Sequence, residues 1–357
     1  RGFVAVGSRG YGGMSVVCTT RSAREYGTID EHRITRVFTN QLERVCAQEG
    51  VPLEYAFLHY GRSGLGGMDG ARERLRQLAR RGPRVMALVQ TPGLDQAHAS
   101  RLCALFQSVK VPIAVIDFDG RVEVARLPRY RLGFMGVGDP ARPGAALGDF
   151  LVGKGYRRIG IVSLHGAGMW QQERTDALVA RVRQRTPDAR FFSYAVPVGD
   201  MPEPDIPAFT APRLRQEGIR YRRVRGQMNT DAEQARNQYR LRRGIHPLLE
   251  QAMPADRPDV LVGLNDNIAV AVLDVLYSLG FDIPRQCAAV GFDDSSLAFA
   301  AHLSSYNFNW HATAREILRF GYTCAEDLSK PAVLRVDGYV VDRMTTADGA
   351  AEGRSEA

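Results

Sequence analysis

The sequence is poor in the features that mark membrane, disulfide-rich and zinc-binding proteins. No apolar run in its 357 residues approaches the ~20 residues that cross a bilayer, so no membrane partner is expected. The cysteines form no CxxC pair, and an odd, dispersed set argues against both a disulfide framework and a zinc site. There are five of them, Cys18, Cys46, Cys103, Cys287 and Cys324. A reducing compartment, and hence a cytoplasmic protein, is the better expectation.

The short motifs of common enzymes are missing as well. The sequence contains no GxSxG and no HExxH, and its seven histidines show no metal-ligand spacing. The glycine-rich segment 61–70 matches neither a Walker A loop nor GxGxxG, because Asp69 stands where the third glycine would be. We therefore expect no enzyme, no cofactor and no metal. An α/β fold by itself would not exclude an enzyme.

What the sequence does have is an ordinary globular composition with a basic balance. Hydrophobic residues make up 45% and charged residues 24%, and a chain of this length is expected to form two lobes. The formal net charge of +8 comes mostly from arginine. Such a charge could favour a nucleic-acid partner, although an arginine-rich, solvated surface explains it as well.

The most informative stretch is 258–294, which has a strand–helix–strand pattern. An apolar run at 260–264 stops at Asn265-Asp266, a helical stripe follows, and a second apolar run at 287–292 stops at Asp293-Asp294. This is a parallel βαβ unit whose two strands both end in a polar pair. Ligands of open α/β sheets bind outside the carboxyl ends of the strands. The two pairs are therefore expected to converge on one small polar molecule.

The same alternation runs through the rest of the chain and predicts two doubly wound α/β lobes. In the first half, strands are expected at 14–18, 53–58, 86–89 and 112–116, with helices at 31–48, 71–81 and 94–109. A second lobe is expected to begin with a strand at 132–137. Further strands follow at 159–163 and 190–196, with helices at 140–155, 173–185, 231–243, 245–253 and 312–328. The Pro- and Arg-rich segment 198–228 is expected to be an irregular connection with one helix or strand.

Several segments resemble the effector-binding domain of the LacI/GalR family of bacterial transcription regulators. The matching segments are PDVLVGLNDNIA, GFDIP and AVGFDD within 258–294, GDPARPGAALGDFLVGKGYRRIGIVS at 138–163, and the closing LRVDGYVVDRMTT at 334–346. The resemblance implies the type 1 periplasmic-binding-protein fold, two parallel-sheet lobes joined by crossover strands. One departure is that Ser304-Ser305 stands where the family has Thr-Thr before a crossover strand.

The resemblance also implies a division of the chain. Residues 14–131 with about 307–330 would form the N-terminal lobe, and 132–306 with about 331–346 the C-terminal lobe. Residues 1–13 are expected to be a linker, or the remnant of a DNA-binding head, because RGFVAV is similar to the last wing strand of a GntR-type winged helix. The small, polar residues 347–357 are expected to be a disordered tail.

Three site residues are expected both from the chemistry of the sequence and from the resemblance. Asp293 could accept from two ligand hydroxyls, or instead cap a turn together with Asp294. Asn265 can donate and accept at once, so we predict that it faces the ligand while Asp266 caps the following helix. Arg174 lies where the family carries a ligand-gripping arginine, although a surface arginine is the alternative.

Further candidates rest on the residues alone. Asp117 ends a strand of the first lobe and could supply that lobe's ligand contact, with Asp119 competing for the role. Trp170 and Trp310 are the only tryptophans, and each could be either a platform for a sugar ring or a base, or a core residue. Tyr306 is a similar candidate.

The resulting hypothesis is a ligand-responsive transcriptional regulator. The resemblance implies a homodimer that senses a small polar effector, most readily a sugar, and binds operator DNA through a head absent from this sequence. The alternative is a periplasmic sugar-binding protein of a transport system, which shares the fold but works as a monomer.

Overall fold

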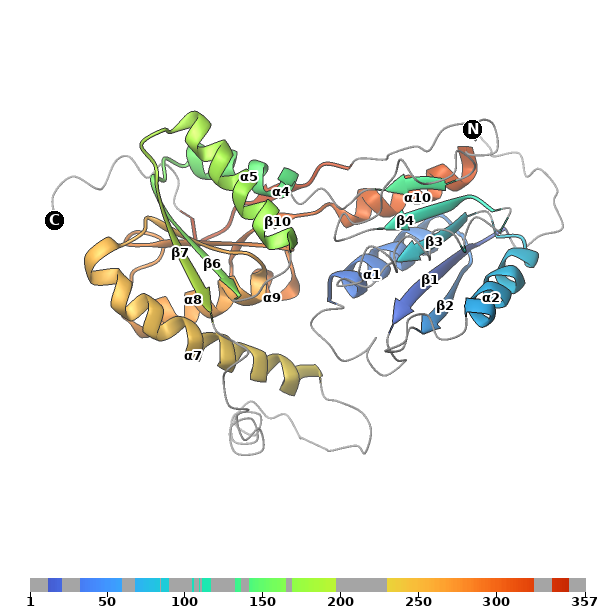
Figure 1. Cartoon of the computed structure of the whole chain (residues 1–357), viewed down its shortest axis with the longest axis horizontal. Helices are drawn as coiled ribbons and strands as arrows, with labels where there is room; N and C mark the ends of the chain where they lie inside the picture. The colour runs from blue at the N-terminus through green and yellow to red at the C-terminus, as the bar shows by residue number, and fades with distance from the viewer. Residues whose placement is uncertain are drawn as a thin grey trace. The chain divides into compact units, whose positions relative to one another are not determined.

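The computed structural model describes most of the chain as two compact units. It describes residues 12–20, 33–59, 68–83, 85–89, 105, 109, 111–116, 132–135, 141–164, 169–196, 230–323 and 336–346. The first unit comprises Arg1–Asp139 and Asn309–Val336, and the second comprises Pro140–Phe308 and Asp337–Ala357. The chain therefore passes between the units three times, as the colours of Figure 1 show.

The first unit is built on a parallel five-stranded sheet in the order β2-β1-β3-β4-β5. Its strands are β1 (Met14–Thr20), β2 (Leu53–His59), β3 (Val85–Val89), β4 (Ile113–Ile116) and β5 (Leu132–Met135). Helix α2 (Met68–Arg80) packs Leu75 and Leu78 into a cluster with one set of strand side chains. Helices α1 (Arg33–Gln48) and α10 (Trp310–Thr323) pack together, and Phe38 meets Trp310 edge-on at 5.8 Å.

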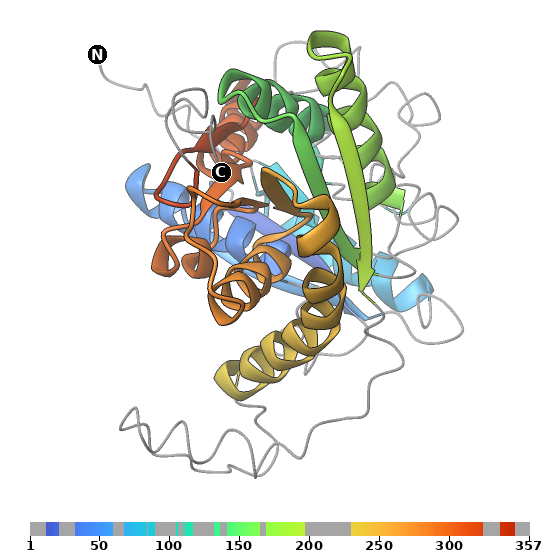
Figure 2. The same cartoon turned by 90° about the vertical axis from the view of Figure 1, so that its left-hand side faces the viewer.

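The second unit has a six-stranded sheet in the order β11-β10-β9-β8-β6-β7. All neighbouring pairs are parallel except β10 with β11. Its strands are β6 (Arg158–Leu164), β7 (Arg190–Val196), β8 (Val260–Gly263), β9 (Ala288–Phe292), β10 (Ser304–Asn307) and β11 (Tyr339–Val341). Helices α4 (Ala141–Gly153) and α5 (Met169–Arg185) cover one face, and α7 (Thr230–Asp256) and α8 (Asp266–Ser278) cover the other (Figures 1 and 2).

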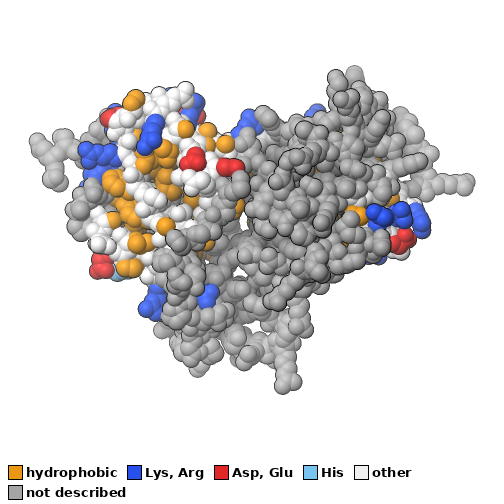
Figure 3. All heavy atoms as spheres, in the orientation of Figure 1, with side chains coloured by type: hydrophobic (Ala, Val, Ile, Leu, Met, Phe, Trp, Pro, Cys, Tyr) orange, Lys and Arg blue, Asp and Glu red, His pale blue; other side chains and the backbone are white. Residues whose placement is uncertain are grey.

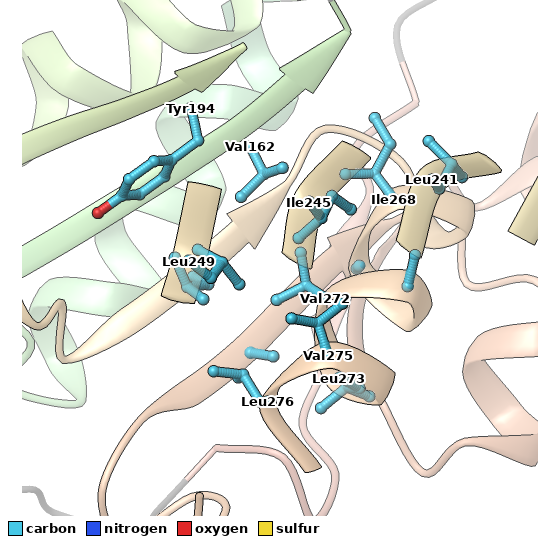
Figure 4. Close-up of a cluster of buried hydrophobic side chains, with 14 of the residues drawn as sticks. Val162, Tyr194, Leu241, Ile245, Leu249, Ile268, Val272, Leu273, Val275 and Leu276 are labelled. Atoms are coloured by element: carbon cyan, nitrogen blue, oxygen red, sulfur yellow. The ribbon is translucent and has the colours of Figure 1, made fainter. Parts of the chain in front are cut away.

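The α7–α8 face holds the larger core of this unit. Leu241, Ile245 and Leu249 recur at helical spacing along α7 and point toward Val272 of α8 and Val162 of β6 (Figure 4). These side chains are buried, and complete burial of an aliphatic side chain contributes roughly 1.5–3 kcal/mol. The short helix α9 (Ser296–Ala300) adds Ala298 to the same cluster.

The structure confirms the doubly wound α/β fold and corrects some predicted boundaries. Residues 132–135 do not open the second unit, because β5 pairs with β4 in the first sheet. The predicted boundary at 131/132 is therefore wrong, and the first unit continues to Asp139. Helix α5 begins at Met169 rather than near Glu173, which brings Trp170 into its first turn. The two helices predicted for 231–253 are one helix, which runs through Gly244 and Pro247.

Some predictions fall outside the described residues. These concern the linker up to residue 11, most of the helix at 94–109, the segment 198–228 and the tail 347–357. None of the helices in the described part of the chain combines the length and apolar character needed to cross a membrane. On the face in Figure 3, the described surface of the second unit has basic side chains interspersed with acidic and hydrophobic ones.

Candidate ligand-binding site

The first polar pair, Asn265-Asp266, follows β8, and its two side chains have roles that differ from the predicted ones. Asn265 is the N-cap of α8, and its Oδ1 accepts from the Ile268 N–H at 2.9 Å. The prediction that Asp266 caps this helix is therefore wrong. Both residues are good caps, but only the first of them has the extended backbone, φ −151°, that a cap requires. The capping bond uses the amide oxygen of Asn265 and not its NH₂ group.

Asp266 instead lies inside the unit and ties three strand ends together. Its Oδ1 accepts from the Ser305 hydroxyl at 2.6 Å, and its Oδ2 accepts from the Ser295 N–H at 2.7 Å. The side chain is 2% exposed. Burial raises the pKa of Asp266 to about 6, even though these hydrogen bonds favour the ionised form and so oppose the rise. The carboxylate thus fixes the loops that follow β8 and β9 against β10.

The second polar pair follows β9, and its second member is also internal. The Asp294 carboxylate accepts from Arg343 Nη2 at 2.6 Å and from Asn307 Nδ2 at 2.7 Å, and its N–H donates to the Ser305 hydroxyl at 3.0 Å. The side chains of Asp294 and Arg343 are only 13% and 17% exposed. Asp294 therefore neutralises a nearly buried cation and holds the strand end in place.

Asp293 has a different environment. Its backbone has φ +106°, a conformation that L residues rarely adopt, and its N–H donates to the Tyr306 carbonyl at 2.9 Å. The side chain is half-buried, and although burial lowers the pKa of Arg174, the charge of Asp293 is the largest influence that opposes this fall. Asp293 is thus the member of the pair that acts on Arg174.

Arg174 is the centre of a cluster that also contains Asp293, Trp170, Phe292 and Phe308; we call it the Arg174 cluster. It is 5% exposed, and its Nη1 donates to the Leu264 carbonyl at 2.6 Å. Three aromatic rings surround the guanidinium, with its central carbon 4.4 Å from Phe292, 4.7 Å from Trp170 and 5.3 Å from Phe308. Its Nε–H finds no acceptor among the described residues.

The electrostatics of Arg174 follow from this enclosure. Burial lowers the pKa of Arg174 to about 10, and the charge of Asp293 is the largest opposing influence. The group therefore remains a cation at neutral pH. A buried guanidinium with an unused donor can hold an additional oxygen acceptor, such as a hydroxyl or carboxylate oxygen of a ligand.

Comparison with known proteins agrees with this architecture. Residues 206–346 match the family described as periplasmic binding protein-like domain. The fold is similar to that of a LacI transcriptional regulator from a Rhodococcus species, with 17% identity, a TM-score of 0.56, and coverage of 94% of this chain and 98% of that one. The chain has the two-lobed fold of LacI-type regulators. The resemblance stated from 258–294 and the type 1 periplasmic-binding-protein fold are thereby confirmed.

Two other solved structures show the same LacI-type fold. The dimeric lac repressor, with an 11-residue C-terminal deletion, has 11% identity and a TM-score of 0.56, covering 94% of this chain and 99% of that one. A LacI family transcriptional regulator from Enterococcus faecium, with bound ribose, has 13% identity and a TM-score of 0.53 with the same coverage. Comparison with curated proteins gives no match.

Within this LacI-type fold, four of the predicted site residues gather at one sheet edge. Trp170 lies one helical turn before Arg174, and Asn265 and Asp293 follow β8 and β9. Arg174 connects them through the Leu264 carbonyl, the Trp170 ring and the charge of Asp293.

The other predicted site residues have different positions. Tyr306 is buried, its hydroxyl accepts from the Gly338 N–H, and its ring packs on Phe292 and Phe308, so it supports the cluster from within. Trp310 belongs to the core of the first unit, where it meets Phe38. Asp117 and Asp119 lie outside the described residues.

Sequence reasoning missed Phe292 and Phe308. An aromatic residue at the end of an apolar strand is normally core, and nothing in the local sequence indicates that its ring lies against a cation. The alternation along 306–308 was the available signal, because residues two apart in an extended segment lie on the same face, and the ring centroids of Tyr306 and Phe308 are 5.1 Å apart.

The closing segment of this fold is anchored on β10. The Ser304 hydroxyl lies 2.6 Å from the Thr346 hydroxyl and accepts from the Arg343 N–H at 2.8 Å, while the Ser304 N–H donates to Thr345 Oγ1 at 2.9 Å. Arg343 Nη1 also donates to the Leu303 carbonyl at 2.8 Å. The Ser304-Ser305 pair thus bonds to the closing segment on one side and to Asp266 on the other.

Proposed function

We propose that this chain is the effector-binding and dimerisation domain of a ligand-responsive, DNA-binding transcriptional regulator. The observation that carries the proposal is the Arg174 cluster, a buried cation with an unused N–H donor beside a half-buried Asp293. Both lie at the carboxyl edge of a parallel sheet, where open α/β folds bind small molecules. This chain is proposed to sense a metabolite rather than to transform one, and so is not an enzyme.

The chemistry of the cluster favours a small polar effector, most readily a sugar. Arg174 supplies donors, Asp293 supplies acceptors, and Asn265 can supply both. The Trp170 ring is only half-buried and offers a flat apolar face of the kind that stacks on a sugar ring. The similar regulator with bound ribose supports this ligand class. Asp117 of the first unit is proposed as a further ligand contact.

Similarity to regulators favours this function over that of a periplasmic transport protein. A dimeric repressor is among the similar structures, which supports a homodimer. We propose that effector binding shifts the equilibrium between two arrangements of the lobes, and that DNA-binding heads attached to the dimer respond to the shift. The site of action is the cytoplasm. Sedimentation of the purified chain tests the dimer, and a monomer at micromolar concentration contradicts it.

A thermal-shift screen tests the ligand site. The panel contains pentoses, hexoses, uronic acids, sugar phosphates and purines. A ligand present at a hundred times its Kd adds about 2.7 kcal/mol of stability. For a chain of this length that corresponds to a rise in Tm of roughly 2–4 °C.

Variants then locate the ligand. Asp293→Ala and Arg174→Lys are expected to abolish the rise, because the first removes the acceptor and the second replaces the planar fork with a point charge. Arg183→Ala is the matched control, since Arg183 is an exposed residue on the same helix. A rise that survives in both site variants, or no rise with any compound, contradicts the proposed site.

A further inference from the structure

Helix α4 passes unusually close to helix α5 at the residue that carries the site. A Cβ added to Gly144 would lie 2.1 Å from the Arg174 carbonyl oxygen, 3.0 Å from its carbonyl carbon and 3.2 Å from its Cα. All three are backbone atoms, so no side chain can turn aside to make room. One turn later on α4, a Cβ on Gly148 would lie 3.2 Å from the Leu178 carbonyl oxygen. The closest approach of the two helices is therefore centred on Gly144 and Arg174.

The other end of Arg174 is held just as firmly. Its guanidinium donates to the Leu264 carbonyl and is enclosed by the rings of Trp170, Phe292 and Phe308. The Arg174 backbone thus rests on α4, while its charged group is fixed at the ends of β8 and β9. Any displacement of α5 away from α4 must pull the guanidinium out of its aromatic surroundings or tilt it against them.

We propose that Gly144 is a positioning residue for the effector site, because it sets the place of the Arg174 backbone. The inference rests on the proposed function for its biological meaning but not for its test. Gly144 lies five residues after Asp139, where the chain crosses from the first unit into the second. The same helix therefore links this crossover to the arginine of the site. A displacement of about 1 Å in a binding group is enough to weaken its interactions substantially.

Trp170 provides a readout that needs no ligand. The chain has two tryptophans, and Trp310 belongs to the first unit. In a Trp310→Phe background, the fluorescence therefore comes from Trp170, whose ring lies 4.7 Å from the Arg174 guanidinium carbon. The Arg174→Met variant in this background is the reference. It gives the emission spectrum and the acrylamide quenching that Trp170 has when no guanidinium lies over its ring.

Gly144→Ala is expected to move the emission maximum and the quenching constant of Trp170 toward those of Arg174→Met. Two controls accompany it. Gly153→Ala lies on the same helix with nothing within 4 Å of the added Cβ and is expected to leave Trp170 unchanged. Leu249→Ala weakens the core on the opposite face of the sheet and tests whether general loosening has the same effect. All spectra are taken well below each variant's Tm.

A folded Gly144→Ala protein with an unchanged Trp170 spectrum would overturn the proposal. An equal shift in Leu249→Ala would also overturn it. If Gly144→Ala does not fold, Gly148→Ala replaces it, because its added Cβ is less crowded. This variant must then give a smaller shift in the same direction, and no shift overturns the proposal.

The effector screen separates this inference from the proposed function. If the screen yields a sugar, Gly144→Ala is expected to weaken its binding about 10–100-fold, while Gly153→Ala leaves it unchanged. If the screen yields nothing but Trp170 still responds to Gly144→Ala, the positioning role stands and the proposed effector function fails. Unchanged sugar affinity in a folded Gly144→Ala protein overturns the positioning role alone.

Discussion

The two polar pairs at the ends of β8 and β9 look alike in the sequence and differ in the structure. In Asn265-Asp266 the first residue caps a helix and the second is buried among hydroxyl and N–H donors. In Asp293-Asp294 the first has an unusual backbone beside Arg174 and the second neutralises Arg343. The second residue of each pair holds the fold together, whereas the first is half-buried and is proposed to contact the effector. Neighbouring carboxylates can therefore have separate roles, which mutations should separate.

The largest expected effect belongs to Asp294. Asp294→Ala leaves the nearly buried Arg343 without its counter-charge and removes the acceptor of Asn307, so the free energy of unfolding should fall by about 3 kcal/mol. Asp293→Ala is the control next to it and should change stability by less than about 1 kcal/mol. Urea unfolding of both variants measures the difference. Equal losses of unfolding free energy in the two variants would show that the two aspartates do not have separate roles.

A pH dependence should distinguish Asp266 from the other acidic residues. Its pKa is raised to about 6 in the folded protein from an ordinary value of 3.8, so the folded state binds the proton more tightly. The stability contributed by this group is therefore greatest below pH 4 and is lost as the pH rises to about 6. A shift of this size corresponds to on the order of 2–3 kcal/mol.

The comparison that isolates this effect is with Asp266→Asn, which cannot titrate. Between pH 4 and pH 6.5 the wild type should lose stability relative to the variant, and above that range the difference should be constant. Both proteins are unfolded in urea at each pH. Parallel profiles would mean that Asp266 has an ordinary pKa.

A smaller effect is expected at Asn265, where capping and ligand binding can be separated. Asn265→Ala removes the cap of α8 and should cost about 1 kcal/mol of stability. Asn265→Asp keeps the capping oxygen but loses the NH₂ donor, so it should preserve stability while lowering the affinity for the effector. Thermal unfolding with and without the effector measures both. If Asn265→Asp binds as well as the wild type, Asn265 is only a cap.

The smallest expected effect is a difference between two variants of Asp293. Asp293 has φ +106°, which glycine adopts without strain, so Asp293→Gly should be more stable than Asp293→Ala by about 1 kcal/mol. Both variants lack the carboxylate beside Arg174 and should lose effector binding. Urea unfolding measures the difference, and equal stabilities of the two variants would show that the backbone at Asp293 is not strained.

Much of the fold could be predicted because apolar periodicity fixes strands and helices locally. The errors arose where packing between residues distant in the sequence determines which sheet a strand joins or whether a helix continues. A strand at 132–135 looks the same whichever sheet it joins, and here it joined the first. The sequence predicted a break at Gly244, but Leu241, Ile245 and Leu249 bury one continuous helical stripe, which overrides local propensity.

The site was partly predictable for the same reason. Arg174, Asn265 and Asp293 stand out because polar residues follow apolar strands or begin a helix beside them. The cap was assigned to Asp266 instead of Asn265, because both side chains can cap a helix and only the backbone conformation decides between them. Phe292 and Phe308 could not be distinguished from core residues, because their partner is an arginine distant in sequence.

The passage from β10 to α10 is a tightly constrained stretch of backbone. Phe308 is buried in the second unit, Trp310 is buried in the first, and Asn309 alone separates them, with φ +57°. Because the side chains of Phe308 and Trp310 are both buried, the backbone between them has little conformational freedom. Asn309 is therefore held between two buried residues in a left-handed conformation, which asparagine adopts more readily than most L residues. Because Phe308 also lies against Arg174, this crossover begins at a residue that contacts the arginine proposed to grip the ligand.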